Sequence, residues 1–141
     1  MIIYERRAYY HETDQMGVIH HANYFKWMEE ARIHFLDELG LSYKKMEEIG
    51  IISPIISVGA EYKKSVYFDD IVEIKIFINK YNGIKLDLSY EIYNKTKGYL
   101  AIKANSVSCF LKDGNIISLK REYPHFDEVL NNYKEKSDNN E

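Results

Sequence analysis

Two consecutive stretches of alternating apolar and polar residues constrain the fold of this chain more than any other feature. Residues 72–78 place valine or isoleucine at every second position, and residues 84–92 repeat the alternation after Asn82-Gly83. A period of two is typical of a strand with one buried face. Asn-Gly between two such strands is a strong signal for a hairpin. We therefore predict an antiparallel hairpin at the centre of the fold.

The register of this hairpin follows from which side chains must share its apolar face. A two-residue loop would set Ile78 opposite Asp87, whereas a three-residue loop over residues 81–83 sets Ile78 opposite Leu86. One face can be buried only if apolar residues pair with apolar residues. The longer loop also places Gly83 where a turn with a bulge needs left-handed backbone. We therefore predict the three-residue loop.

A helical period precedes the hairpin. Apolar side chains recur at helical spacing from Tyr24 to Leu39, and polar residues occupy the other faces. Asn23 fits the N-cap of this helix and Gly40 fits its C′ stop. Residues 42–50 then have the signals of a second, short helix. One long helix followed by antiparallel strands predicts an α+β fold in which the sheet covers the helix.

The two ends of the chain complete the expected order of elements. We predict a strand over residues 4–10, a strand over 99–112 and a final helix over 123–133. No repeat or linker divides the chain, so residues 1–133 are expected to form one domain. Residues 134–141 are polar and charged, which predicts a disordered tail.

Charge and composition exclude several classes of protein. The 19 basic and 22 acidic side chains give a net charge of −3, which argues against nucleic acid as a partner. No apolar stretch approaches the roughly 20 residues that a membrane span needs. The single cysteine, Cys109, cannot form an internal disulfide and fits a reducing compartment, so we expect a cytoplasmic protein. The five histidines have no recognised metal-ligand spacing, and we predict no metal site.

An aspartate near the start of the long helix is the strongest candidate for chemistry. Asp14 precedes the helix N-terminus by a few residues, and backbone N–H groups there lack partners and carry partial positive charge. A carboxylate beside such donors can attack a carbonyl or activate water while the N–H groups hold the oxyanion. From residue types alone, the same segment also fits a plain turn.

Three motifs carry a family resemblance. They are residues 12–24 (ETDQMGVIHHANY), residues 27–32 (WMEEAR) and residues 62–70, where YKK is followed by YFDD. Together they resemble the hotdog-fold acyl-CoA thioesterases, most of all the branch of 4-hydroxybenzoyl-CoA thioesterase and YbgC. The resemblance extends over about residues 4–119 and implies a long helix wrapped by a bent antiparallel sheet of five or six strands.

The resemblance also implies an activity and two catalytic residues. The expected reaction is hydrolysis of a thioester of coenzyme A or of an acyl-carrier protein. No cofactor is expected, because coenzyme A is part of the substrate. Asp14 matches the family's catalytic aspartate, as nucleophile or as general base. The His21 backbone N–H matches the oxyanion donor, and its side chain matches a histidine that orients substrate or water. The family forms homo-oligomers, dimers or tetramers, with active sites shared between subunits.

Five further residues are candidates for substrate binding. Gly17 would let the loop approach the thioester closely. Tyr24 and Trp27 fit the acyl pocket or, equally well, the core. Lys80 and Lys85 stand where the 4-hydroxybenzoyl branch has a basic turn that holds the phosphates of coenzyme A, although exposed hairpin lysines are usually only solvated.

Two other functions fit the same fold. One is a hydratase or dehydratase acting on acyl thioesters, and the other is a non-catalytic subunit that binds acyl-CoA or an acyl carrier, since fold alone does not determine function. The sequence also leaves open whether the acyl group is short, long or aromatic.

Overall fold

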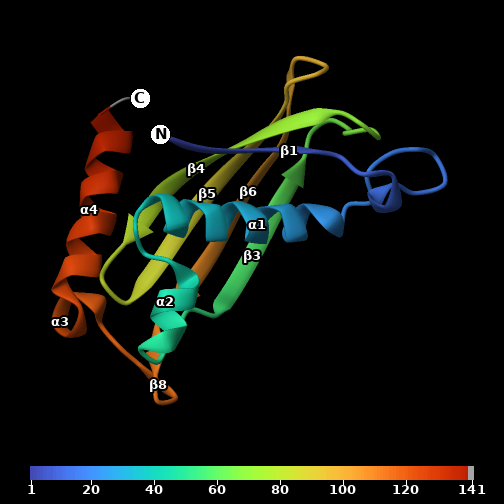
Figure 1. Ribbon diagram of the computed structural model, residues 1–141. Helices are drawn as coiled ribbons and strands as arrows, with labels where there is room; N and C mark the ends of the chain where they lie inside the picture. The colour runs from blue at the N-terminus through green and yellow to red at the C-terminus, as the bar shows by residue number, and fades with distance from the viewer. Residues whose placement is uncertain (140–141) are drawn as a thin grey trace.

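A five-stranded antiparallel sheet wraps around one long helix, α1, in the computed structural model, which describes residues 1–139 (Figure 1). The strand order is β1-β4-β5-β6-β3. In that order the strands are β1 (Ile2–Arg7), β4 (Ile71–Tyr81), β5 (Lys85–Asn94), β6 (Tyr99–Cys109) and β3 (Ile55–Tyr62). The α+β class and the helix wrapped by a sheet of five strands are confirmed.

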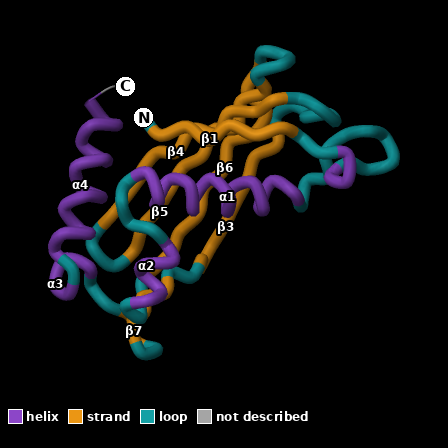
Figure 2. The backbone as a smooth tube through the Cα atoms, in the orientation of Figure 1, coloured by secondary structure: helices purple, strands orange, loops and turns teal. Residues whose placement is uncertain are grey.

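The remaining elements lie around this unit (Figure 2). The helices are α1 (Asn23–Glu38), α2 (Tyr43–Glu48), α3 (Leu119–Glu122) and α4 (Pro124–Asn139), with a short 3-10 turn, η1, at Tyr10–Glu12. A small second sheet contains β2 (Ile51–Ile52), β7 (Leu111–Lys112) and β8 (Asn115–Ile116). None of the helices within residues 1–139 has both the length and the apolar character required to cross a bilayer.

The core lies between α1 and the concave face of the sheet. Every second residue is buried from Val72 to Ile78 in β4 and along β5, as the alternation predicted. Trp27, Ala31 and Phe35 of α1 are fully buried against these strands. Burying one large apolar side chain contributes roughly 1.5–3 kcal/mol. This apolar layer therefore holds the helix on the sheet and sets where its N-terminus lies.

The central hairpin has a different register from the predicted one. Ile78 lies opposite Leu88 instead of Leu86. A bulge after Ile78 and a wider loop, in which Asn82 Oδ1 accepts two backbone N–H groups, shift the pairing by two residues. A shift of two leaves the same side chains on the buried face, so alternation could not separate these registers. Gly83 does have the predicted positive φ, at 89°.

The start of α1 also differs in detail. Ala22 occupies the N-cap, so the prediction that Asn23 caps the helix is wrong. Asn23 instead donates from its side-chain Nδ2 to the backbone oxygen of Glu12, 2.9 Å away. Gly40 has a φ of 79° just after the helix, which confirms it as the C′ residue.

Both ends of the chain depart from the expected boundaries. Strand β1 ends at Arg7, and Tyr10 already belongs to η1, so the predicted strand over residues 4–10 is too late and too long. Helix α4 continues to Asn139, so the tail predicted to be disordered from Lys134 is helical as far as that residue. Residues 140–141 lie outside the described residues.

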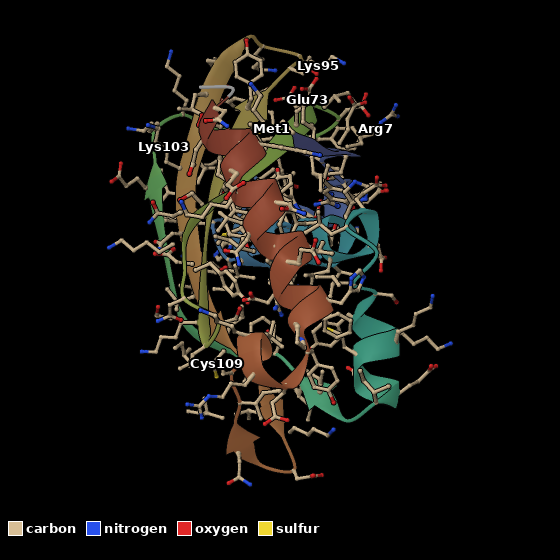
Figure 3. The ribbon with its side chains drawn as sticks, turned by 90° about the vertical axis from the view of Figure 1, so that its left-hand side faces the viewer. Met1, Arg7, Glu73, Lys95, Lys103 and Cys109 are labelled. Carbon is tan, nitrogen blue, oxygen red and sulfur yellow. The ribbon has the colours of Figure 1, made fainter. Side chains whose placement is uncertain are left out.

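Buried side chains along one face of α4 explain why the helix extends so far. Leu130, Tyr133 and Ser137 are buried at a spacing of three and four residues. The Tyr133 hydroxyl donates to the backbone oxygen of Ile76, 2.6 Å away, and its ring meets Phe35 edge to face. In Figure 3 the helix crosses in front of the molecule, between the sheet on one side and α1 and α2 on the other.

Candidate active site

An open cavity of about 310 Å³ lies at the N-terminus of α1. It brings the predicted Asp14, His21 and Tyr24 together with the end of β3. Its lining residues are Asp14, Val18, Ile19, His20, His21, Tyr24, Tyr62, Lys63, Lys64 and Ser65. Groups that are separate in the sequence thus share one cavity.

A tight loop holds Asp14 in this cavity. Its Oδ1 accepts hydrogen bonds from the backbone N–H groups of Met16 and Val18, at 2.8 and 3.2 Å. Gly17 has a φ of 78°, which favours glycine. Within residues 1–139, Oδ2 of Asp14 accepts from no protein donor. One carboxylate oxygen therefore fixes the loop, and the other is available to a ligand.

Two histidines end the loop. Nδ1 of His20 accepts from the backbone N–H of Ala22 at 3.2 Å, which satisfies one of the free amides at the helix start. The His20 and His21 rings stack at 4.4 Å, and His21 meets the ring of Tyr62 edge-on at 5.9 Å. The backbone N–H of His21 donates to no acceptor in the described part of the chain. This amide, next to the positive end of the helix dipole, is suited to binding an anion.

A buried carboxylate, Glu12, anchors the loop through hydrogen bonds to its side chain. Its side chain accepts from Arg6 at 2.9 Å, from Trp27 Nε1 at 2.8 Å and from the backbone N–H of Tyr9 at 2.9 Å. Hydrogen bonds to a charged group are among the stronger ones in proteins. Glu12 therefore links β1, η1 and α1 through a single side chain.

The backbone oxygen of Glu12 ties the same loop to the helix. It accepts from the backbone N–H of His20 at 2.9 Å and from the side chain of Asn23 at 2.9 Å. The two ends of the segment that contains Asp14 are therefore joined. Sequence reasoning assigned Glu12 no role, although it opens the first family motif.

A second polar cluster supports the segment that pairs with the loop. Asp70 is buried and accepts from Lys97, Asn94 and the backbone N–H of Tyr67 at 2.8–2.9 Å. Burial alone would raise the pKa of the Asp70 carboxyl, but these hydrogen bonds and the Lys97 charge outweigh burial and lower it. The cluster fixes residues 66–70, which pair with the loop through Val18 and Ile19.

The substrate-binding candidates divide between the cavity and the core. Tyr24 lines the cavity, and burial raises the pKa of its hydroxyl to about 12, so it stays protonated at neutral pH. Trp27 is fully buried under Arg6 and does not line the cavity, so its place is in the core. Gly17 does not line the cavity either, and its positive φ shapes the loop.

Lys80 and Lys85 lie at the other end of the sheet. Tyr62, at the cavity, pairs through β6 with Ile92, seven residues along β5 from Lys85. At about 3.4 Å per residue this separation is roughly 24 Å. Within one chain these two lysines therefore lie far from the cavity, and their role in binding phosphates stays a prediction.

The lysines in the cavity are Lys63 and Lys64, which the sequence reasoning left without a role. Both belong to the third family motif, residues 62–70, and that motif was the signal in the sequence that could have identified them. Within residues 1–139, no three His, Cys, Asp or Glu side chains gather as metal ligands.

Comparison with known proteins places this geometry in context. The sequence profile of the thioesterase-like superfamily matches residues 10–132. A protein named "Putative esterase" from Aquifex aeolicus is 35% identical over 120 residues, which cover 85% of this chain and 92% of that protein. A protein named "Putative acyl-CoA thioesterase YneP" from Bacillus subtilis is 42% identical over 97 residues, covering 69% of this chain and 70% of that protein.

A solved structure shows the same fold. DHNA-CoA thioesterase from Staphylococcus aureus superposes with a TM-score of 0.91 and is 36% identical in sequence. The match covers 99% of this chain and 94% of that one.

Proposed function

This chain belongs to the thioesterase-like superfamily, and from that membership and the cavity at α1 we propose that it hydrolyses an acyl-CoA thioester to a free acid and coenzyme A. The related proteins support a thioester hydrolase as the class of enzyme. The roles of individual residues are part of the proposal.

Asp14 supplies the reacting oxygen. Its Oδ2 attacks the thioester carbonyl, or takes a proton from the water that does so, while Oδ1 keeps the loop in place. The carbonyl oxygen gains negative charge in either route. The His21 N–H and the positive end of α1 stabilise that charge, and the His21 ring orients the substrate or the water.

The leaving group makes this small set of residues sufficient. A simple thiol has a pKa of ~8.5, so a thiolate departs with little help from a general acid. The mechanism therefore needs no serine-histidine-aspartate triad.

One observation supports this proposal above the others. Asp14 and His21 come from opposite ends of one loop and face the same cavity, and Glu12 pins both ends of that loop. The loop thus holds the free carboxylate oxygen and the free amide in fixed positions next to a bound carbonyl. Electrostatic stabilisation of an oxyanion requires groups that are fixed in this way.

Replacing Asp14 tests the proposal. In Asp14→Asn the amide oxygen can still accept from Met16 and Val18, so the loop should keep its shape. We expect kcat on an acyl-CoA to fall by about 10²-fold or more, the scale of losing a positioned base. Release of thiol, followed with a chromogenic disulfide, is the measurement. Asp37→Asn, an exposed aspartate on α1, is the matched control and should retain full activity.

The choice of substrates determines how informative that assay is. Tyr24, Tyr62 and His21 give the cavity an aromatic wall, and one relative is named for DHNA-CoA. The panel should therefore contain DHNA-CoA beside straight-chain acyl-CoAs of several lengths. Wild-type rates in Asp14→Asn would remove the aspartate from the mechanism. Turnover of an unsaturated acyl-CoA without release of thiol would indicate hydration in place of hydrolysis.

A further inference from the structure

A bulge at the end of β3 turns two consecutive lysines toward one cavity. The backbone N–H groups of Lys63 and Lys64 both donate to the oxygen of Ala101, at 2.8 and 3.1 Å. In a regular strand, consecutive side chains point to opposite faces. A bulge opposes two residues to one and redirects a side chain, and bulges are frequent next to active sites. This geometry explains how both lysines line the cavity that contains Asp14.

Three other cations at this end of the sheet have ion-pair partners. Arg7, Lys95 and Lys97 each contact at least one carboxylate within 3.3 Å. Figure 3 shows Lys95 beside Glu73, near Arg7, at the same end of the molecule. Of the three, Lys97 is held most firmly because its partner Asp70 is buried, whereas the pairs of Arg7 and Lys95 with Asp69 and Glu5 are exposed.

The lysines at the bulge are different. Among the described residues, no carboxylate lies within ion-pairing distance of Lys64, whose Nζ sits 4.9 Å from the ring centre of Tyr99. Lys63 contacts Glu61 at 3.5 Å, but the Glu61 side chain is 75% exposed, and such surface pairs contribute little. Two lysines therefore line the cavity at the bulge, and among the described residues only Lys63 has an ion-pair partner.

We propose that Lys63 and Lys64 bind the phosphate groups of coenzyme A, a role that rests on the proposed function of the same cavity. Lysine ammonium groups are point charges on flexible stems and are common phosphate ligands. With the thioester held at Asp14 and His21, the flexible lysine stems at the bulge can direct their ammonium groups toward the phosphates at the far end of the pantetheine arm. This pair takes the place of Lys80 and Lys85 as the phosphate site.

Binding of free coenzyme A tests this directly, because it requires no turnover. Coenzyme A carries phosphates, whereas pantetheine has the same thiol arm without them. In Lys63→Ala with Lys64→Ala, we expect the Kd for coenzyme A, measured by calorimetry, to rise about tenfold, which corresponds to roughly 1.4 kcal/mol. The Kd for pantetheine should not change. Lys63→Arg with Lys64→Arg keeps both charges and should bind coenzyme A nearly as tightly as wild type.

A matched control exists on α2. Lys44 and Lys45 are also consecutive and exposed, and their double alanine variant should bind coenzyme A normally. An unchanged Kd for coenzyme A in the Lys63/Lys64 variant overturns the proposal. So does an equal loss of pantetheine binding, which would mean that the pair shapes the cavity only.

Two further outcomes keep this proposal separate from the enzymatic one. No binding of coenzyme A to the wild type, or a loss that follows Lys80→Ala with Lys85→Ala in place of the bulge variant, also overturns the phosphate site. Absence of hydrolysis with every thioester, while coenzyme A still binds through the bulge, would contradict the proposed function alone.

Discussion

The apolar layer under α1 and the polar end around the cavity are built on different principles. In the layer, Phe35 and its neighbours are fully buried and contact one another through side chains of similar chemistry. Around the cavity, Glu12 and Asp70 are also buried, but each is surrounded by donors that must lie at particular positions.

The difference separates stability from geometry. Hydrophobic burial is non-directional and tolerates many arrangements of similar volume. A buried carboxylate tolerates few, because every unsatisfied donor or acceptor is costly. The layer therefore determines whether the chain folds, and the polar end determines where Asp14 lies once it has folded.

The largest effect on stability is expected in the apolar layer. Phe35→Ala removes a fully buried ring that packs on Tyr133, and should lower the free energy of unfolding by about 4 kcal/mol. The folded fraction should keep its kcat. Urea denaturation and thiol-release kinetics on the same samples measure the two quantities. If Phe35→Ala lost as much activity per folded molecule as Glu12→Ala, the apolar layer and the polar end would not differ in their effect on the site.

Glu12→Ala should give the next largest loss of stability, about 3 kcal/mol, because Arg6 and Trp27 lose their shared acceptor. Here we also expect kcat/KM per folded molecule to fall at least tenfold, since the loop with Asp14 loses its anchor. Glu12→Gln keeps an acceptor, so its stability and its kcat/KM should lie between those of the wild type and Glu12→Ala. Full activity in Glu12→Ala would show that the loop does not depend on this carboxylate.

Acid should affect the polar end through Asp70. Its folded pKa is lowered, so its contribution to stability is complete above the unfolded pKa of ~3.9 and is lost as the pH falls through the lower folded value. Asp70→Asn should cost about 1.5 kcal/mol at pH 7 and flatten the decline in stability below pH ~4. Chemical denaturation from pH 3 to pH 7 compares the two proteins. Parallel curves would assign the acid sensitivity to other carboxyls.

The smallest effect is expected at the far end of the sheet. Burial, together with the carboxylate of Asp127 that accepts from the hydroxyl, raises the pKa of Tyr81 well above its ordinary value. Tyr81→Phe removes one half-buried hydrogen bond and should cost about 1 kcal/mol, with KM and kcat unchanged. A change in KM for acyl-CoA would connect the hairpin with substrate binding.

Periodicity predicted the apolar layer well and the polar end poorly. The alternation in β4 and β5 and the helical spacing in α1 identified these elements, because each pattern reflects one buried face. It could not detect the bulges after Ile78 and at Lys63, since a bulge depends on hydrogen bonds to another strand.

The candidate site was predictable to the extent that one motif contains it. Asp14, His21 and Tyr24 lie within thirteen consecutive residues, and the fold brings all three to one cavity. β3 contributes to the cavity because it pairs with a strand about forty residues further along the chain. No local sequence pattern encodes such a pairing. Lys80 and Lys85 were assigned by analogy with a basic turn, and within one chain the pairing register puts that turn at the end of the sheet away from the cavity.

The two oxygens of Asp14 have separate tasks, and this has a consequence for the reaction path. On the proposed function, an acyl group transferred to Oδ2 would leave the bonds from Met16 and Val18 to Oδ1 in place. A mixed anhydride could therefore form and be hydrolysed without any rearrangement of the backbone. In isotopically labelled water, attack on the Asp14 carbonyl carbon of this anhydride would leave the label in the protein, which direct attack of water on the thioester does not do.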